Sequence, residues 1–272
     1  MIFNDYTNKA VLITGGTAGI GLATGLAFGR VGAQVYLTHR WGSEDNEEIK
    51  NQFKERGFIE PVIIEADASN KEDTQSLVET IAKNHPSIET FISNVAFGHV
   101  SKRPTDLERR SLLATLKYNA WPVLDYLKEI KRVTGKFPRY VIGMSSRGPE
   151  TYLQGYDFIA ASKAALESIC KRLTALLIKE DIRINVLCPN TILTKSFEAT
   201  FDPEFKYHLE NSLGKYGNYF VIKPDKVANV AVALCGGGMD AIKGQVLNLD
   251  QGACFSENLN MVYKYFTKDD KS

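Results

Sequence analysis

The sequence predicts a single-domain α/β fold, a doubly wound and mostly parallel sheet of about seven strands flanked by helices. Short apolar runs alternate with longer segments of helical period along the chain. The runs are rich in Val, Ile, Leu and Tyr, which is typical of strands buried on both faces. No repeat, low-complexity tract or long linker breaks this order. Repeated β-α-β units with right-handed crossovers therefore account for one domain over residues 1–272.

The expected strands are seven short apolar runs, at Ala10–Thr14, Gln34–Thr38, Pro61–Glu65, Thr90–Ser93, Tyr140–Met144, Arg183–Leu187 and Gln245–Leu249. The expected helices lie between them, at Ile20–Val31, Glu44–Arg56, Lys71–Asn84, Thr105–Val133, Gly155–Glu180 and Pro224–Cys235. Helical period is clearest within Asp73–Lys83, where Leu77, Ile81 and Ala82 fall on one side.

Two segments depart from this alternation. Residues 195–219 combine aromatic and charged residues without a clean period, between the sixth strand and the last helix. A long irregular insertion at that point suits a lid over a substrate. Residues 253–272 are polar and aromatic, and we expect them to form a C-terminal tail or a subunit contact.

Composition excludes several classes of protein. The chain has 33 Lys+Arg and 32 Asp+Glu, a net charge of +1, which argues against a nucleic-acid binder coated in positive charge. Its 44% of hydrophobic residues suffice for a sizeable core and exclude global disorder. The uncharged stretch Ala10–Gly29 is long enough to span a bilayer. Its six glycines and three threonines weaken that reading, so we expect no membrane span.

The cysteines indicate a reducing environment. The four cysteines are Cys170, Cys188, Cys235 and Cys254. They are far apart and form no C-x-x-C pair, so we expect them to be buried reduced thiols that form neither a disulfide framework nor a metal site. The first residues lack the basic start and apolar core of a secretory signal. We therefore expect a cytoplasmic protein.

A glycine-rich turn follows the first expected strand, in the sequence Thr14-Gly15-Gly16-Thr17-Ala18-Gly19-Ile20-Gly21. The strand must turn sharply into a helix here, and the helix start leaves backbone N–H groups without partners. Glycine permits the turn and lets a pyrophosphate approach the helix N-terminus, where the dipole favours anions. Because the turn stands at the first β-α junction of a βαβ repeat, it indicates a dinucleotide site.

This T-G-x-x-x-G-x-G spacing resembles the short-chain dehydrogenase/reductase family, and the resemblance covers nearly the whole chain. It implies a Rossmann-type fold and a nicotinamide-dependent oxidoreductase. Further matching segments are Asp67, the family's adenine-binding aspartate, Ser93-Asn94-Val95-Ala96, Asn119, Pro189-Asn190 and Asp250-Gln251-Gly252. The cofactor-binding residues that the resemblance implies are Gly15, Thr17, Ala18, Gly19, Ile20, Gly21, His39, Arg40, Asp67, Ala68, Asn94, Lys163, Ile192 and Thr194, the last two beside the nicotinamide carboxamide.

The end of the second expected strand favours NADPH over NADH. An acidic residue there would bind the ribose hydroxyls and repel a 2′-phosphate. This chain instead has His39 and Arg40. A guanidinium pairs well with phosphate oxygens, so we expect NADPH, with NADH as the weaker alternative.

The spacing of a tyrosine and a lysine indicates the reaction. Most members of the family carry Tyr-x-x-x-Lys, but Ile159 stands four residues before Lys163. Tyr156 stands seven residues before it, and this Tyr-x6-Lys spacing resembles the NADPH-dependent enoyl-acyl-carrier-protein reductase branch. Seven residues are close to two helical turns, so both side chains would share one face, with the tyrosine about 4.5 Å further along the axis. That position suits a donor to a thioester oxygen, which lies several bonds from the carbon that accepts hydride.

We expect catalytic roles for three side chains. Lys163 would hold the nicotinamide ribose and lower the proton affinity of Tyr156 by its charge. Tyr156 would donate a hydrogen bond to the developing enolate. Ser146 would orient the substrate or Tyr156. Two further candidates for substrate contact are Tyr152, one turn before Tyr156, and Ala96.

Three functions stay open at this point. The first is an enoyl-thioester reductase of fatty-acid or polyketide synthesis. The second is a carbonyl reductase of the same family acting on a 3-ketoacyl or polyketide ketone. The third is a non-catalytic NADP-binding protein.

The partners that we expect follow from the same resemblance. The substrate would be an acyl thioester, which an acidic acyl carrier protein could present. Lys102 to Arg132 holds eight Lys/Arg against four Asp/Glu and is a candidate docking patch, with Lys102, Arg103, Arg109 and Arg110 in its first part. Relatives pair through the two long helices, so we expect a homodimer or homotetramer. We expect no nucleic-acid partner.

Overall fold

The computed structural model describes residues 5–40, 45–98, 100, 103–201, 206–207 and 221–255. Seven strands form one parallel sheet in the order β3-β2-β1-β4-β5-β6-β7. The predicted doubly wound α/β fold is confirmed. The strands are β1 (Ala10–Ile13), β2 (Gln34–His39), β3 (Val62–Glu65), β4 (Ile88–Ser93), β5 (Tyr140–Met144), β6 (Arg183–Pro189) and β7 (Val246–Leu249).

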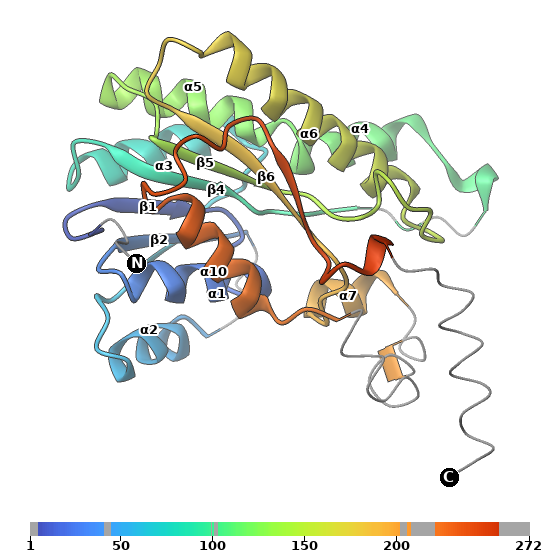
Figure 1. The fold of residues 1–272 in the computed structure, drawn as a ribbon, viewed down its shortest axis with the longest axis horizontal. Helices are drawn as coiled ribbons and strands as arrows, with labels where there is room; N and C mark the ends of the chain where they lie inside the picture. Colours follow the sequence, from blue (N-terminus) through green and yellow to red (C-terminus); the bar gives the residue numbers. More distant parts are fainter. Residues whose placement is uncertain are drawn as a thin grey trace.

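Helices cover both faces of the sheet (Figure 1). One face packs against α1 (Gly19–Gly29), α2 (Asn46–Glu55) and α10 (Pro224–Leu234). The other face packs against α3 (Lys71–Ala82), α5 (Pro122–Thr134) and α6 (Asp157–Leu176), with α4 (Arg109–Asn119) beside α6. Each layer encloses its own apolar cluster, which explains why the central strands β1 and β5 are buried along their whole length.

The expected single helix over 105–133 is wrong. A short 3-10 turn, η1 (Pro104–Asp106), precedes α4, and the chain breaks between α4 and α5 at Ala120 and Trp121. Proline lacks an N–H and its ring clashes with the preceding turn, so it breaks a helix at its interior and fits at a start. Pro122 stands in the first turn of α5.

The helix expected from Gly155 is also shorter, because α6 begins at Asp157. Tyr156 has φ −97° and ψ 9° and stands at the N-cap position, outside the helix. The argument that Tyr156 and Lys163 share one helical face is therefore wrong, although the chain still brings both to one cavity, as shown below. Gly155, with φ +78°, makes the turn that starts α6.

Both segments that depart from the alternation are only partly described. The predicted lid, 195–219, begins with a short helix, α7 (Lys195–Thr200), and most of the rest lies outside the described residues. Of the predicted tail, 253–272, only the 3-10 turn η3 (Ala253–Phe255) is described. The lid, the tail and the single-domain boundaries 1–272 stay predictions.

Candidate cofactor and active site

A cavity of about 710 Å³ lies at the carboxyl edge of the sheet. Its wall comes from the segments that follow β4, β5 and β6, together with α7 and the start of α6. This edge is where an open parallel sheet binds its ligands. Lining side chains include Asn94, Ser146, Tyr156, Lys163, Ile192 and Thr194.

The glycine turn borders this cavity and requires its glycines. Gly15 has φ +61° and Gly19 has φ +52°, a left-handed backbone that other residues rarely adopt. A Cβ on Gly21 would lie 2.2 Å from the carbonyl oxygen of Gly15. The Asn94 amide supports the turn, because it donates to the carbonyl oxygens of Thr14 (3.0 Å) and Gly15 (2.9 Å). Asn94 thus acts on the turn from the neighbouring strand.

The start of α1 fits a bound anion. Ala18 is its N-cap residue, with extended backbone and no side-chain cap, and the first turn holds no acidic residue. The first N–H groups of a helix carry partial positive charge and need an acceptor. A Cβ on Gly19 would lie 3.1 Å from the Thr194 methyl group, so Thr194 closes over the turn. A bare helix start in a cradle of glycines matches what a pyrophosphate needs.

The adenosine end of the predicted site holds an arginine engaged by an aspartate. Arg40 Nε lies 3.0 Å from Asp67 Oδ2. The Tyr118 hydroxyl contacts Arg40 Nη1 and donates to Asp67 Oδ2 at 3.2 Å. The expected residues His39 and Ala68 are the sequence neighbours of this pair, His39 at the end of β2 and Ala68 in the segment after β3. Sequence reasoning missed Tyr118, whose only signal is that it precedes Asn119 on α4.

Lys163 lies deep in the reaction centre. Its side chain is buried, and its ammonium donates to the Met144 carbonyl oxygen at 2.7 Å. Burial lowers the pKa of Lys163 to about 8, and the negative charge of Glu167 opposes that shift. Glu167 stands one turn further along α6 and accepts a hydrogen bond from Ser145 Oγ at 2.5 Å. Sequence reasoning did not single out Glu167.

Tyr156 and Ser146 form the other part of the centre. Burial raises the pKa of Tyr156, and a hydrogen bond with the Ser146 side chain offsets part of that rise. The Tyr156 ring stacks on Phe201 with centroids 6.0 Å apart. It also lies against Gly148, where a Cβ would approach the ring to 2.7 Å. Strand β5 and the start of α6 thus bring the three predicted catalytic side chains to one cavity.

Ile159 fills the position four residues before Lys163. It is buried, lines the cavity and packs on Gly98, where a Cβ would lie 2.0 Å from its side chain. The Asn119 side chain fixes this contact from both sides. It accepts from the Phe97 N–H at 2.7 Å and donates to Ser162 Oγ at 2.8 Å. An apolar wall therefore occupies the place where most of the family carries its tyrosine.

Some of the remaining expected site residues line the cavity and one does not. Ala96, Ile192 and Thr194 line the cavity as expected. Tyr152 is not among the lining residues; it is 79% exposed and lies outside α6. The expectation that Tyr152 contacts substrate is therefore not supported by its position. Arg147, which was not expected, lines the cavity and pairs with Asp250 at 3.3 Å.

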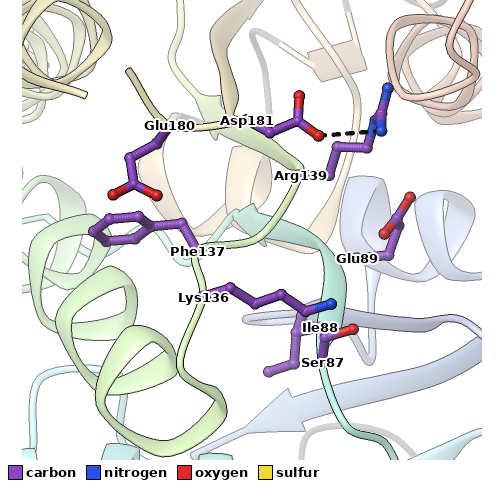
Figure 2. Close-up of a pocket in the computed structure, with 8 residues that line it drawn as sticks. All are labelled: Ser87, Ile88, Glu89, Lys136, Phe137, Arg139, Glu180 and Asp181. Atoms are coloured by element: carbon purple, nitrogen blue, oxygen red, sulfur yellow. Dashed lines mark hydrogen bonds and ion pairs between the residues drawn. The ribbon is translucent and has the colours of Figure 1, made fainter. Parts of the chain in front are cut away.

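A second cavity, of about 230 Å³, lies at the opposite, amino edge of the sheet (Figure 2). Its charged groups are mostly paired, with Arg139 3.2 Å from Asp181 and the Glu89 and Glu180 carboxylates held by lysines. This cavity contains none of the predicted site residues.

Three expected absences can be compared with the described residues. Within them, no group of His, Cys, Asp and Glu could hold a metal ion, and all four cysteines are free. Cys170, Cys188 and Cys235 are buried as expected, whereas Cys254 is exposed and lines the cavity. None of the helices in the described ranges is long and apolar enough to cross a membrane.

The fold and this site define a dinucleotide-binding α/β protein. The model of the family described as enoyl-(acyl carrier protein) reductase matches residues 15–254. The chain therefore belongs to the short-chain dehydrogenase/reductase family, and it is an oxidoreductase of that family.

Relatives support the same placement. The chain is 25% identical to general stress protein 39 of Bacillus subtilis, over 90% of this chain and 84% of that protein. It is 28% identical to a 7alpha-hydroxysteroid dehydrogenase of Paraclostridium sordellii, over 83% of this chain and 84% of that protein. A crystal structure of a variant actinorhodin polyketide ketoreductase with NADPH superposes with a TM-score of 0.78 at 20% identity, covering 90% of this chain and 97% of the other. At that identity, the last comparison supports the fold.

Proposed function

We propose that this protein reduces the C=C bond of an enoyl thioester with NADPH. One observation carries the proposal. Tyr156 shares a cavity with Lys163 and Ser146, while Ile159 fills the position four residues before Lys163. Isoleucine has no proton to donate. The hydrogen-bond donor to substrate is therefore Tyr156, at the spacing that resembles enoyl reductases.

The residues present fit the dinucleotide. The glycine turn and the bare start of α1 would hold the pyrophosphate, and Asp67 and Ala68 the adenine. Arg40 would bind the 2′-phosphate, and the solved ketoreductase named above contains NADPH. Ile192 and Thr194 would face the carboxamide and Lys163 the ribose. When bound, NADPH supplies the hydride.

The chain's own groups would act on the thioester oxygen. As hydride reaches Cβ, the electrons of the C=C bond move toward the carbonyl and leave negative charge on its oxygen. The Tyr156 hydroxyl donates a hydrogen bond to that oxygen, and Ser146 orients the hydroxyl. A proton from solvent water then adds at Cα and completes the saturated thioester. The buried Lys163 ammonium favours partial negative charge on the tyrosine oxygen.

Carbonyl reduction is the second candidate, since the relatives named above include a hydroxysteroid dehydrogenase and a polyketide ketoreductase. The Tyr156–Ser146 pair would then protonate an alkoxide. A nucleotide-binding protein without catalysis is the third. Purified protein with NADPH and either crotonyl-CoA or acetoacetyl-CoA separates these functions. We expect a higher kcat/KM for crotonyl-CoA. Faster reduction of acetoacetyl-CoA would establish the second function, and binding without turnover would establish the third.

Acyl carrier protein is the proposed source of the thioester. Arg109 and Arg110 are exposed at the start of α4, and Arg110 pairs with Glu108 at 2.5 Å. Exchange of both arginines for glutamate should raise KM for a carrier-bound enoyl substrate and leave KM for crotonyl-CoA unchanged. Equal KM values for wild type and variant would refute docking at this patch. The protein is also proposed to form a homodimer or homotetramer through α4 and α6.

A further inference from the structure

Tyr118 connects two charged groups at the adenosine end of the site. Its hydroxyl contacts the Arg40 guanidinium and donates to the Asp67 carboxylate at 3.2 Å. Its ring lies beneath the same guanidinium, whose carbon is 5.3 Å from the ring centroid. Phe97 packs on Tyr118 with centroids 5.1 Å apart and fixes the ring from the β4 side. Both polar and aromatic contacts therefore hold Arg40 where it is.

Asp67 is the internal partner of Arg40 and is itself firmly placed. Its Oδ1 accepts from the backbone N–H and the hydroxyl of Ser69, both at 2.8 Å. Its Oδ2 accepts from Tyr118 and from Arg40. Burial raises the pKa of Asp67, but the Ser69 hydrogen bonds and the charge of Arg40 outweigh it, so the net pKa is lowered. The carboxylate thus stays charged at neutral pH and competes for the guanidinium.

This inference rests on the proposed function, in which Arg40 binds the 2′-phosphate of NADPH. A phosphate carries up to two negative charges and would draw Arg40 toward itself. Arg40 is already paired with Asp67, so the phosphate must share that guanidinium or separate the pair. NADH has only a ribose hydroxyl at this position and leaves the pair intact.

We propose that Tyr118 sets cofactor selectivity, because it holds Arg40 on Asp67 and makes NADPH, but not NADH, separate that pair. The residue limits the preference for the phosphorylated cofactor. Removing its hydroxyl takes away one of the contacts that hold Arg40 on Asp67, so a phosphate separates the pair more easily and that preference increases.

The test is the ratio of the dissociation constants of NADH and NADPH, measured by nicotinamide fluorescence with the full chain. Tyr118→Phe keeps the ring and removes the hydroxyl that contacts both charged groups. The Arg40–Asp67 pair is partly exposed, at 38% and 17% of the two side chains, so the ratio should rise about two- to fivefold. Asp67→Asn should move the ratio in the same direction. Any loss of adenine contact in that variant weakens the binding of both cofactors equally and therefore cancels in the ratio of their dissociation constants.

Tyr140→Phe is the matched control. The Tyr140 hydroxyl also bonds to an arginine and an aspartate, Arg139 at 3.1 Å and Asp240 at 2.9 Å, and Arg139 lies 5.6 Å from its ring centroid. This cluster stands at the start of β5, at the amino edge, so the ratio should not change. An Arg40→Ala background supplies a second check, because Tyr118→Phe should have no effect on the ratio there.

The outcomes separate the two proposals. An unchanged or lower ratio in Tyr118→Phe, with tight NADPH binding by the wild type, overturns this inference and leaves the proposed function standing. A persistent effect of Tyr118→Phe in the Arg40→Ala background also overturns it. Absence of binding of either nucleotide to the wild type overturns the inference and the proposed function together.

Discussion

The glycine turn offers a prediction whose magnitude follows from the structure. In Gly21→Ala the new Cβ would lie 2.2 Å from the Gly15 carbonyl oxygen and 2.9 Å from the Gly16 Cα, both backbone atoms. No side-chain rotation can relieve these contacts, so the turn itself must move. Overpacking of this kind costs about 1–3 kcal/mol of unfolding free energy, and we expect the upper half of that range because only backbone can yield.

The same displacement should weaken cofactor binding. Moving the start of α1 misaligns the N–H groups proposed to meet the pyrophosphate. Loss of one hydrogen bond to a charged group costs about 1.5–3 kcal/mol, so the dissociation constant of NADPH should rise about 10- to 100-fold.

Urea unfolding of the apo protein and fluorescence titration with NADPH measure the two effects. Gly238→Ala is the control, because a Cβ there meets nothing within 4 Å and the backbone φ is not positive. If Gly21→Ala and Gly238→Ala had the same urea midpoint and the same NADPH affinity, the tight turn would be needed neither for stability nor for pyrophosphate binding.

Four further predictions concern the charge of Lys163 and the support of the turn. Because burial lowers the pKa of Lys163 to about 8, kcat/KM should fall as pH rises through about 8, where the ammonium loses its proton. Apo stability should rise with pH between about 8 and the ordinary lysine pKa, since the unfolded chain binds the proton more tightly there; a fall in stability from urea titrations would contradict the assignment. Glu167→Gln removes the negative charge that opposes the lowering of the Lys163 pKa, so the basic limb of the kcat/KM profile should move to lower pH. An unchanged basic limb would show that Glu167 does not influence the pKa of Lys163. Asn94→Ala removes two hydrogen bonds to the turn and should cost about 1–3 kcal/mol in urea unfolding, whereas Asn229→Ala, at an exposed position, should cost less than about 0.5 kcal/mol.

The fold could be predicted from the sequence because the signals for strands and turns are local. The apolar run Ala10–Ile13 and the glycines after it specify a buried strand and a sharp turn within a dozen residues. The break between α4 and α5 also had a local signal, since Pro122 stands inside the segment that was expected to be one helix. Tyr152 was expected one helical turn before Tyr156, but Gly155 has φ +78° and α6 begins only at Asp157, so helical spacing does not extend back to Tyr152.

Parts of the site depend on contacts between distant segments, which one sequence does not display. Tyr118 and Glu167 occupy ordinary helical positions, and each gains its role from a partner on another element, Arg40 after β2 and Ser145 after β5. The Arg40–Asp67 pair likewise joins the ends of neighbouring strands. Its place after the second expected strand predicted Arg40 as a phosphate ligand, but the sequence could not indicate that an internal carboxylate already engages it.

The central claim is that the Tyr156 hydroxyl stabilises the enolate formed from an enoyl thioester. Turnover of crotonyl-CoA and the dissociation constant of NADPH, both measured for Tyr156→Phe, test it most directly. We predict that kcat falls about 10²- to 10³-fold, the cost of removing one donor to a developing oxyanion, while NADPH affinity stays near that of the wild type. Lys163→Met, which removes a group proposed to contact both ribose and tyrosine, should weaken turnover and affinity together. Unchanged turnover in Tyr156→Phe would contradict the account.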